Sequence, residues 1–186
     1  MGRGLKREER ILLYGSNLWY LGEGMLGPLF AVFATRIGGN ILDISWAWAT
    51  YLAVTGILIV LIGRLVDRSD KEKILVAGYA INAFFTFGYL FVTNSFELIL
   101  VQAGLGVGTA LATPSWDALF DKHTDSKRDG YMWGLAHGHA YIITAVALIL
   151  GGLIVNYFSF AILFAVMGSV QILATLYQAQ ILCKGR

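Results

Sequence analysis

One acidic residue, Glu23, lies in the middle of the first long apolar stretch of the chain. Ionisable groups are costly inside a bilayer, so a carboxyl group there is a candidate functional residue. A helix rises about 1.5 Å per residue, so about 12 residues would place Glu23 roughly 18 Å deep, near the midplane. It could carry a proton, or it could form a structural bond to a neighbouring helix. Tyr20 and Gly27 would share its face, with Asn17 one turn toward the N-terminus.

Polar residues also recur at helical spacing in two later apolar stretches. One stripe consists of Gln102, Thr109, Thr113 and Trp116, and the other of His137, Tyr141 and Thr144. Residues at these spacings lie on one face of a helix. Each stripe could line a polar cavity or could form hydrogen bonds between helices. We treat Asn17, Tyr20, Glu23, Gln102, Thr109, Thr113, His137 and Tyr141 as candidate substrate- or ion-binding residues.

The residue types of catalytic and metal sites do not form a convincing set. Cys183 is the single cysteine, so one chain can build neither a disulfide nor a cysteine metal site. His137 and His139 are two residues apart and would face different sides of a helix. We therefore expect no catalytic residues, no metal, no cofactor and no nucleic-acid partner.

The composition indicates the elements that must position these side chains. Hydrophobic residues make up 57% of the 186 residues and charged residues 14%, whereas a soluble domain is about half apolar and about a quarter charged. A helical span needs about 20 mostly apolar residues. Six segments qualify, which predicts an all-α membrane protein with a single domain over 1–186; the segments are 11–35, 44–66, 74–93, 96–119, 131–155 and 158–182.

The distribution of basic residues predicts the orientation of these six helices. With the N-terminus in the cytoplasm, all of the 14 Lys and Arg residues except Arg36 lie on the cytoplasmic side. Cytoplasmic loops carry an excess of Lys and Arg, so this arrangement is the favoured one. We expect a multi-pass protein of the cell membrane with both termini in the cytoplasm, its basic residues close to anionic lipid head groups.

The chain has two prolines, Pro28 and Pro114, which fall in the first and the fourth predicted helices. Both follow a Gly-x-Gly sequence, and we expect both to break their helices. If the six helices form two sets of three, these two occupy corresponding positions with opposite directions, so the repeats would be inverted. Paired interruptions of this kind point to the binding site of a transporter, although Gly and Pro are also common in membrane helices generally.

The loop after the second predicted helix reads GRLVDRSDKEK over residues 63–73. It resembles the signature loop of the major facilitator superfamily, Gly-x-Leu-Ala-Asp-Arg-x-Gly-Arg-Arg/Lys. The matching residues are Gly63, Leu65, Asp67 and Arg68, with Lys71 as the following basic residue, while Asp70 and Glu72 depart from the pattern. The position between the second and third helices matches as well.

The resemblance implies a role for this loop in gating at the cytoplasmic face. Gly63 would let another helix approach closely, and Asp67 would be favoured near a helix N-terminus. Arg68 could bind the carboxylate of Asp117 or Asp121. The candidate gating residues are therefore Gly63, Asp67, Arg68, Lys71, Asp117 and Asp121. Without the resemblance, the same residues would be interpreted as a solvated basic loop.

The resemblance implies a secondary transporter that moves a small solute by alternating access. Six helices are half of the family's usual twelve, so we expect a homodimer whose central cavity is lined by the first and fourth helices of each copy. The second and fifth helices would make the gating contacts. Two alternatives remain open: half of a hetero-oligomeric transporter, and a non-transporting membrane module or truncated gene product.

Overall fold

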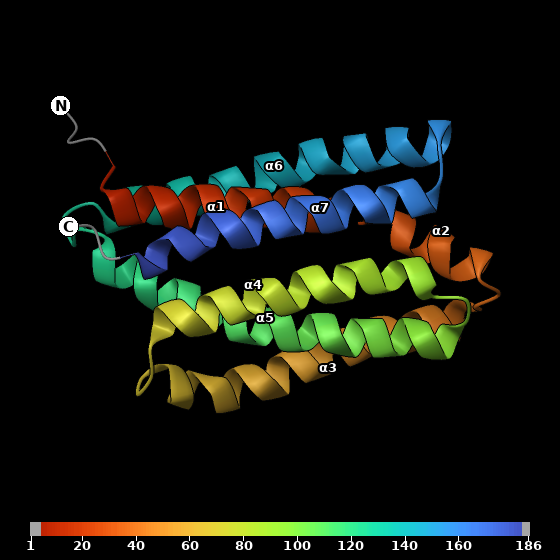
Figure 1. Ribbon diagram of the computed structural model, residues 1–186, viewed down its shortest axis with the longest axis horizontal. Helices are drawn as coiled ribbons and strands as arrows, with labels where there is room; N and C mark the ends of the chain where they lie inside the picture. The colour runs from red at the N-terminus through yellow and green to blue at the C-terminus, as the bar shows by residue number, and fades with distance from the viewer. Residues whose placement is uncertain (1–4, 184–186) are drawn as a thin grey trace.

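The computed structural model describes residues 5–183, which form a bundle of antiparallel helices (Figure 1). Short 3₁₀ turns, Tyr89–Phe91 and Ala179–Leu182, follow the fourth and last helices, and the described residues contain no strand. The prediction of an all-α protein is confirmed. The helices are α1 (Arg7–Gly24), α2 (Leu29–Arg36), α3 (Ile41–Val66), α4 (Lys71–Gly88), α5 (Ser95–His123), α6 (Asp129–Tyr157) and α7 (Phe160–Gln178).

Within the described part of the chain, five helices are long and apolar enough to cross a membrane: α3, α4, α5, α6 and α7, the last with its 3₁₀ turn. The first predicted segment, 11–35, is divided into α1 and α2. Gly27 has a φ of +29°, outside the helical region, and Pro28 is the N-cap of α2. Proline has no N–H and its ring clashes with the carbonyl four residues earlier. The chain is therefore interrupted in front of Pro28.

At Pro114 the structure differs from the sequence prediction. Helix α5 continues from Ser95 to His123 with Pro114 inside it, so the expected break is absent. Proline removes one backbone hydrogen bond, and packing against neighbouring helices can hold the remaining helix in place. Helix α5 packs along both α3 and α4, which supplies that support.

The helices pack as two groups of three. Helices α3, α4 and α5 form one group and α1, α6 and α7 the other, with α4 and α7 in contact between the groups. Helices α4 and α5 approach so closely that a Cβ added to Gly78 would lie 2.7 Å from the backbone nitrogen of Ala112. A Cβ on Gly108 would lie 2.9 Å from the backbone nitrogen of Asn82. Small residues at a crossing allow such backbone contact.

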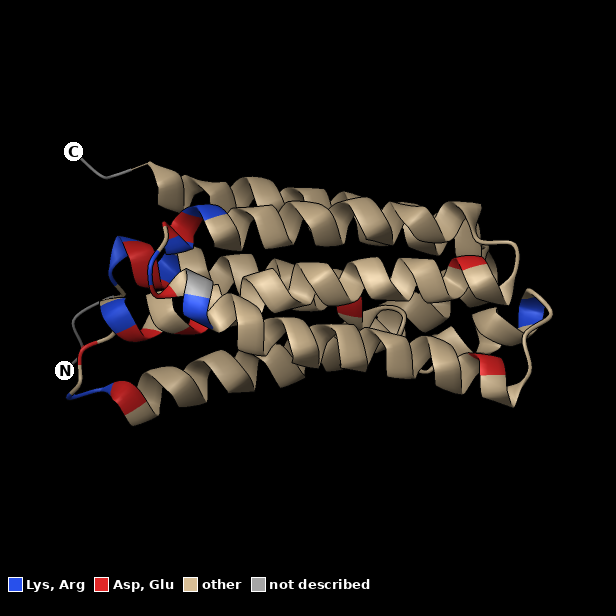
Figure 2. Cartoon of the chain, turned by 90° about the horizontal axis from the view of Figure 1, so that it is seen from below, with Lys and Arg blue, Asp and Glu red and all other residues tan. Residues whose placement is uncertain are grey.

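Figure 2 shows most of the basic residues at one end of the bundle, where α1 begins and α5 ends; we call this the basic end. Arg36, the last residue of α2, lies at the opposite end. At the basic end, Lys6 Nζ donates a hydrogen bond to the carbonyl of His123 at 2.9 Å, and Arg7 donates to the carbonyls of Gln180 and Cys183. These cations satisfy carbonyl groups at the C-terminal ends of helices.

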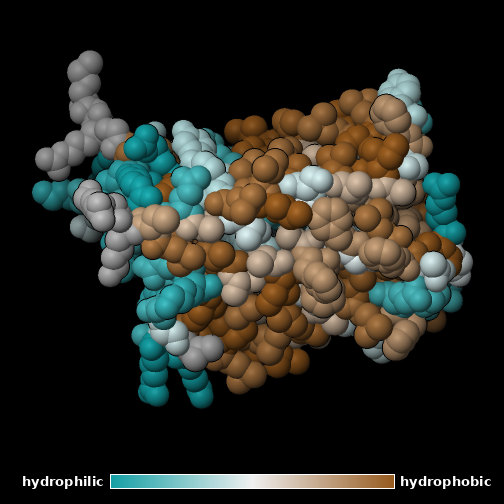
Figure 3. Space-filling model, viewed as in Figure 1, coloured by the Kyte–Doolittle hydropathy of each residue, from teal (hydrophilic) through white to brown (hydrophobic). Residues whose placement is uncertain are grey.

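An apolar belt crosses the face of the bundle shown in Figure 3, between the two polar ends. Helices α3 and α6 are the most exposed of these helices. In the most apolar stretch of each, only 6% and 11% is buried, compared with 39% for α4 and 44% for α5. Such a belt is what the hydrocarbon core of a membrane requires. The structure is therefore that of a multi-pass membrane protein.

The contact between α4 and α5 makes a testable prediction. We expect Gly78→Ala to lower the free energy of unfolding by about 1–3 kcal/mol, because the new methyl group would overlap backbone atoms that cannot move aside. The control is Gly56→Ala in α3, where nothing lies within 4 Å of an added Cβ. Thermal unfolding of the purified proteins in detergent measures both, and equal melting temperatures would contradict the packing described here.

Candidate functional site

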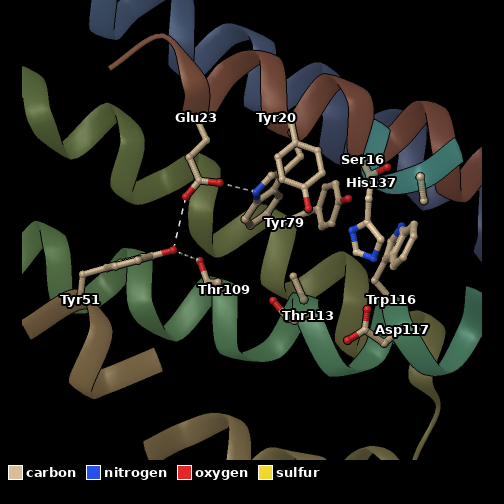
Figure 4. Close-up of a pocket in the computed structure, with 13 residues that line it drawn as sticks. Ser16, Tyr20, Glu23, Tyr51, Tyr79, Thr109, Thr113, Trp116, Asp117 and His137 are labelled. Atoms are coloured by element: carbon tan, nitrogen blue, oxygen red, sulfur yellow. Dashed lines mark hydrogen bonds between the residues drawn. The ribbon is translucent and has the colours of Figure 1, made fainter. Parts of the chain in front are cut away.

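A cavity of about 240 Å³ lies between the two groups of helices and opens beside Glu23 (Figure 4). Helices α1, α3, α4, α5 and α6 all contribute to its wall, so residues far apart in the sequence meet there. The lining residues are Ser16, Trp19, Tyr20, Glu23, Tyr51, Tyr79, Thr109, Ala112, Thr113, Trp116, Asp117, Ala136 and His137.

The carboxyl group of Glu23 is held by hydrogen bonds from two helices. Trp19 Nε1 donates to Glu23 Oε2 at 2.6 Å from the preceding turn of α1. The hydroxyl group of Tyr51 on α3 donates to Glu23 Oε1 at 3.4 Å. The same hydroxyl lies 3.3 Å from Thr109 Oγ1 on α5. Glu23 thus connects α1 to α3 and, through Tyr51, to α5, while it also faces the cavity.

A second cavity, of about 230 Å³, lies on the other side of Glu23 and Tyr51, which line both spaces. Its wall is mostly apolar. The remaining lining residues are Leu26, Gly27, Phe30, Trp48, Asn82, Thr86, Tyr89, Gln102, Leu105 and Met167.

Two buried amide side chains face this second cavity. Asn82 and Gln102 are 1% and 2% exposed. Gln102 Oε1 accepts a hydrogen bond from the Tyr89 hydroxyl at 3.0 Å. Gln102 Nε2 and Asn82 Oδ1 have no hydrogen-bond partner among the residues that the structure describes. Leaving buried polar atoms unpaired is costly, and both side chains belong to the wall of the second cavity.

The structure brings many of the candidate binding residues together. Tyr20, Glu23, Thr109, Thr113 and His137 line the first cavity, and Gln102 lines the second. Two others do not line either cavity.

Asn17 lies on a different side of α1, where its Nδ2 is 3.4 Å from Nδ1 of His139 on α6. Tyr141 is 80% exposed on the outer face of α6. Asn17 therefore does not join Glu23 at the cavity on α1, and Tyr141 does not join His137 there on α6.

The candidate gating residues other than Asp117 lie at the basic end. Asp117 lines the first cavity. Asp67, Arg68 and Asp121 are exposed. Among the described residues, Arg68 forms no ion pair with Asp117 or Asp121, so the contact that the sequence suggested is absent from this conformation.

Other contacts hold the same region together. Lys71 Nζ donates to the carbonyl of Val66 at 3.1 Å, which satisfies a backbone group at the C-terminal end of α3. Lys122 of α5 pairs with Glu72 of α4 at 3.9 Å. Nothing lies within 4 Å of a Cβ added to Gly63, so its open side remains available to another helix.

The sequence prediction missed Ser16, Trp19, Tyr51 and Tyr79 as cavity residues. Trp19 could have been found, because it precedes Glu23 by four residues and therefore lies on the same helical face. Tyr51 and Tyr79 each place a hydroxyl group inside an apolar stretch, which is a weaker signal. Which neighbour such a hydroxyl meets depends on how α3, α4 and α1 pack.

A bundle of apolar helices with a polar, acid-containing cavity at its centre has the architecture of a membrane transport protein. The chain belongs to the Major Facilitator Superfamily, whose sequence model matches residues 12–182. The family that the loop at residues 63–73 resembles is thereby confirmed.

Several curated proteins resemble the chain at low identity. It is 22% identical over 156 residues to an uncharacterized MFS-type transporter, MJ1560, of Methanocaldococcus jannaschii. It is 21% identical over 145 residues to the uncharacterized MFS-type transporter YitZ of Bacillus subtilis. It is 22% identical over 161 residues to the multidrug resistance protein MdtG of Salmonella arizonae.

The lengths of these relatives differ. The alignments cover 84%, 78% and 84% of this chain. They cover 40% of MJ1560 and of MdtG but 88% of YitZ. The chain therefore spans well under half of two of these proteins and most of the third.

The hydrogen bonds of Glu23 make a prediction about stability. We expect Glu23→Leu to lower the free energy of unfolding by about 1–3 kcal/mol relative to Glu23→Gln. Leucine leaves the Trp19 indole N–H without an acceptor, although the Tyr51 hydroxyl can still bond Thr109, whereas the glutamine amide oxygen can accept from the indole. Thermal unfolding of the two purified variants tests this, and a Leu variant as stable as the Gln variant would contradict it.

Proposed function

We propose that the chain is a secondary transporter that moves a small solute across the cell membrane by alternating access. In this proposal it acts as a homodimer of six-helix halves with both termini in the cytoplasm. The observation that supports transport most directly is the cavity around Glu23, a space lined by acidic and other polar groups within an apolar bundle. Motion between packed groups of helices is a common way of changing access to a site.

The six-span topology requires α1 and α2 to cross the membrane together as one interrupted span. Helix α1 begins at the basic end, and α2 ends with Arg36 at the opposite end. Non-helical backbone at membrane depth is tolerated where it is buried in protein or lines a cavity. Gly27, inside the interruption, lines the second cavity, which supports this arrangement. Because the basic end carries most of the positive charge, we place it in the cytoplasm.

The packing pattern supports two inverted repeats. Helix α5 packs against α3 and α4, and helix α1 packs against α6 and α7. Exchanging the first three spans for the last three turns α1 into α5, α3 into α6 and α4 into α7. This exchange converts one set of contacts into the other and leaves the contact between α4 and α7 unchanged. Inverted repeats of this kind place the substrate site at the repeat interface.

A homodimer would supply the second half of the transporter. In the superfamily the two halves are related by an axis along the membrane normal, and a twofold pair satisfies that symmetry. The open faces of α3 and α6 would meet the partner copy and close the cavity. Asp67 of one copy would then lie near Gly130 at the start of α6 in the other, and the exposed Tyr141 would face the partner.

The residues at the basic end would form the cytoplasmic gate in this assembly. Gly63 has open space beside it, as a helix contact with a second copy would need. Asp67 and Arg68 are exposed, so each is free to change partners between conformations. Asp117 lines the first cavity on the side of this region, so a change of its contacts could couple the gate to the occupancy of the cavity.

The coverage of the relatives distinguishes two forms of the assembly. YitZ, of which the chain covers 88%, is of similar extent, as expected for a half-size transporter. In MJ1560 and MdtG, of which the chain covers 40%, most of the sequence lies outside the match, so a second half with a different sequence is the alternative. A homodimer and a heteromer would use the same faces of α3 and α6.

Native mass spectrometry of the purified chain in lipid tests the homodimer. We expect dimers for the natural sequence and monomers for Gly134→Leu, because a leucine side chain on α6 would hold the two copies apart. In the single chain nothing lies within 4 Å of a Cβ added to Gly134, so the monomer should keep its fold. Ser169→Leu places the same bulk on the exposed side of α7 and should leave the dimer intact. Monomers alone for the natural chain would exclude the homodimer.

Coupling to protons is tested on Glu23. We expect solute uptake into proteoliposomes, for a solute found by thermal-shift screening, to respond to an imposed pH gradient. Glu23→Gln should abolish this pH response, because an amide cannot exchange the proton. Glu97→Gln makes the same chemical change in the first turn of α5, outside both cavities, and should leave the pH response unchanged. Unchanged pH-dependent uptake by the Glu23→Gln variant would show that another group couples transport to protons.

A further inference from the structure

The first cavity combines acidic groups with aromatic rings. Glu23 and Asp117 supply carboxyl groups, and five of the other lining residues are aromatic: Trp19, Tyr20, Tyr51, Tyr79 and Trp116. The described residues that line it include no lysine or arginine, and His137 is their one basic side chain. Aromatic faces attract cations through their quadrupole, and a carboxylate adds a direct charge interaction that is stronger in a partly desolvated site than in water.

The second cavity has a different character. Leu26, Phe30, Leu105 and Met167 give it apolar walls. An apolar wall with a few well-placed polar groups is typical of sites that bind the body of a small organic molecule. Asn82 and Gln102, each with one unpaired side-chain atom, are polar residues of this wall.

Glu23 and Tyr51 form the wall that the two cavities share. A molecule with a charged group at one end and an apolar body at the other could therefore place its charge beside the carboxyl group and its body among the apolar residues. The Tyr51 hydroxyl, which bonds Glu23 at 3.4 Å, is the group that such a molecule would have to displace. The bond is long for a hydrogen bond to a carboxylate, so its loss costs little.

We propose that the two cavities together bind one aromatic monocation, with its cationic nitrogen beside Glu23 and its ring in the second cavity. This names the substrate class of the transport function proposed above and rests on that function for its physiological meaning. Anions are disfavoured because the site offers carboxyl groups and no Lys or Arg. Small neutral solutes are disfavoured because they leave the acidic group without a counter-charge.

Isothermal titration calorimetry on the purified chain in lipid nanodiscs tests this, with phenyltrimethylammonium as the probe. We expect saturable binding of this cation. Tetramethylammonium, which lacks the ring, should bind at least about tenfold more weakly because it buries no apolar surface in the second cavity. Benzenesulfonate, which carries the opposite charge on the same ring, should show no binding. Equal affinity for benzenesulfonate and phenyltrimethylammonium would overturn the proposal.

Two variants test where the charged group and the ring of the probe bind. Glu23→Gln should weaken both cations at least about tenfold, while Glu97→Gln leaves both unchanged. Leu105→Phe reduces the space in the second cavity, so it should weaken phenyltrimethylammonium about fivefold or more and spare tetramethylammonium. Unchanged affinity in Glu23→Gln, or equal loss of both cations in Leu105→Phe, would contradict the proposed placement. Should Glu23→Gln fail to fold by thermal unfolding, the comparison of ligand charges and Leu105→Phe still decide the question.

Counterflow measurements separate this proposal from the transport function. Proteoliposomes that contain the natural chain are loaded with unlabelled phenyltrimethylammonium and supplied with the labelled cation outside. Binding in nanodiscs together with accumulation of label supports both proposals. Binding without accumulation contradicts transport and leaves the cation site standing. Transport of another solute by a chain that binds none of the cations contradicts the cation site alone.

Discussion

Where α4 crosses α5, the two backbones touch. Gly78 packs against the backbone of Ala112, and Gly108 packs against that of Asn82. Lipid tails are as apolar as leucine, so helices in a membrane gain little from hiding apolar surface from lipid, and close packing must hold them together. This crossing fixes the register that brings Tyr79 and Asn82 of α4, and Thr109 of α5, to the cavities. The other group has a comparable contact between Gly151 of α6 and the carbonyl of Met25.

The sequence predicted the positions of most membrane helices, which depend on the local composition of the chain. Five of the six predicted segments overlap α3 to α7, because apolar length and charge at the ends are local properties. The prolines show the limit of local reasoning. Pro28 lies just beyond the end of α1 and follows Gly27, whose positive φ is outside the helical region, whereas Pro114 lies in a helix supported on two sides by α3 and α4. The same residue type interrupts one helix and not the other because the neighbours differ.

For the site, too, the sequence predicted the features that lie within one helix. Glu23 stands out because a carboxyl group in an apolar stretch is rare, and the stripe on α5 follows from helical spacing. Tyr51 could not be placed, because its contact with Glu23 depends on how α3 packs against α1. The contact suggested for Arg68 with Asp117 or Asp121 fails in this conformation for the same reason, since a charged side chain at a helix end has several possible partners. Spacing within one helix is readable in the sequence, and distances between helices are not.

The open faces of α3 and α6 also affect how the chain would assemble. In water, such apolar faces would drive association, but in a bilayer lipid tails already cover them at little cost. A single copy is therefore well solvated, and any partner must compete with lipid for the glycine-rich side of α6. Association confined to a membrane depends on the number of copies per unit area. The fraction of paired chains would thus follow the protein-to-lipid ratio, and it would fall as the membrane expands around a fixed number of molecules.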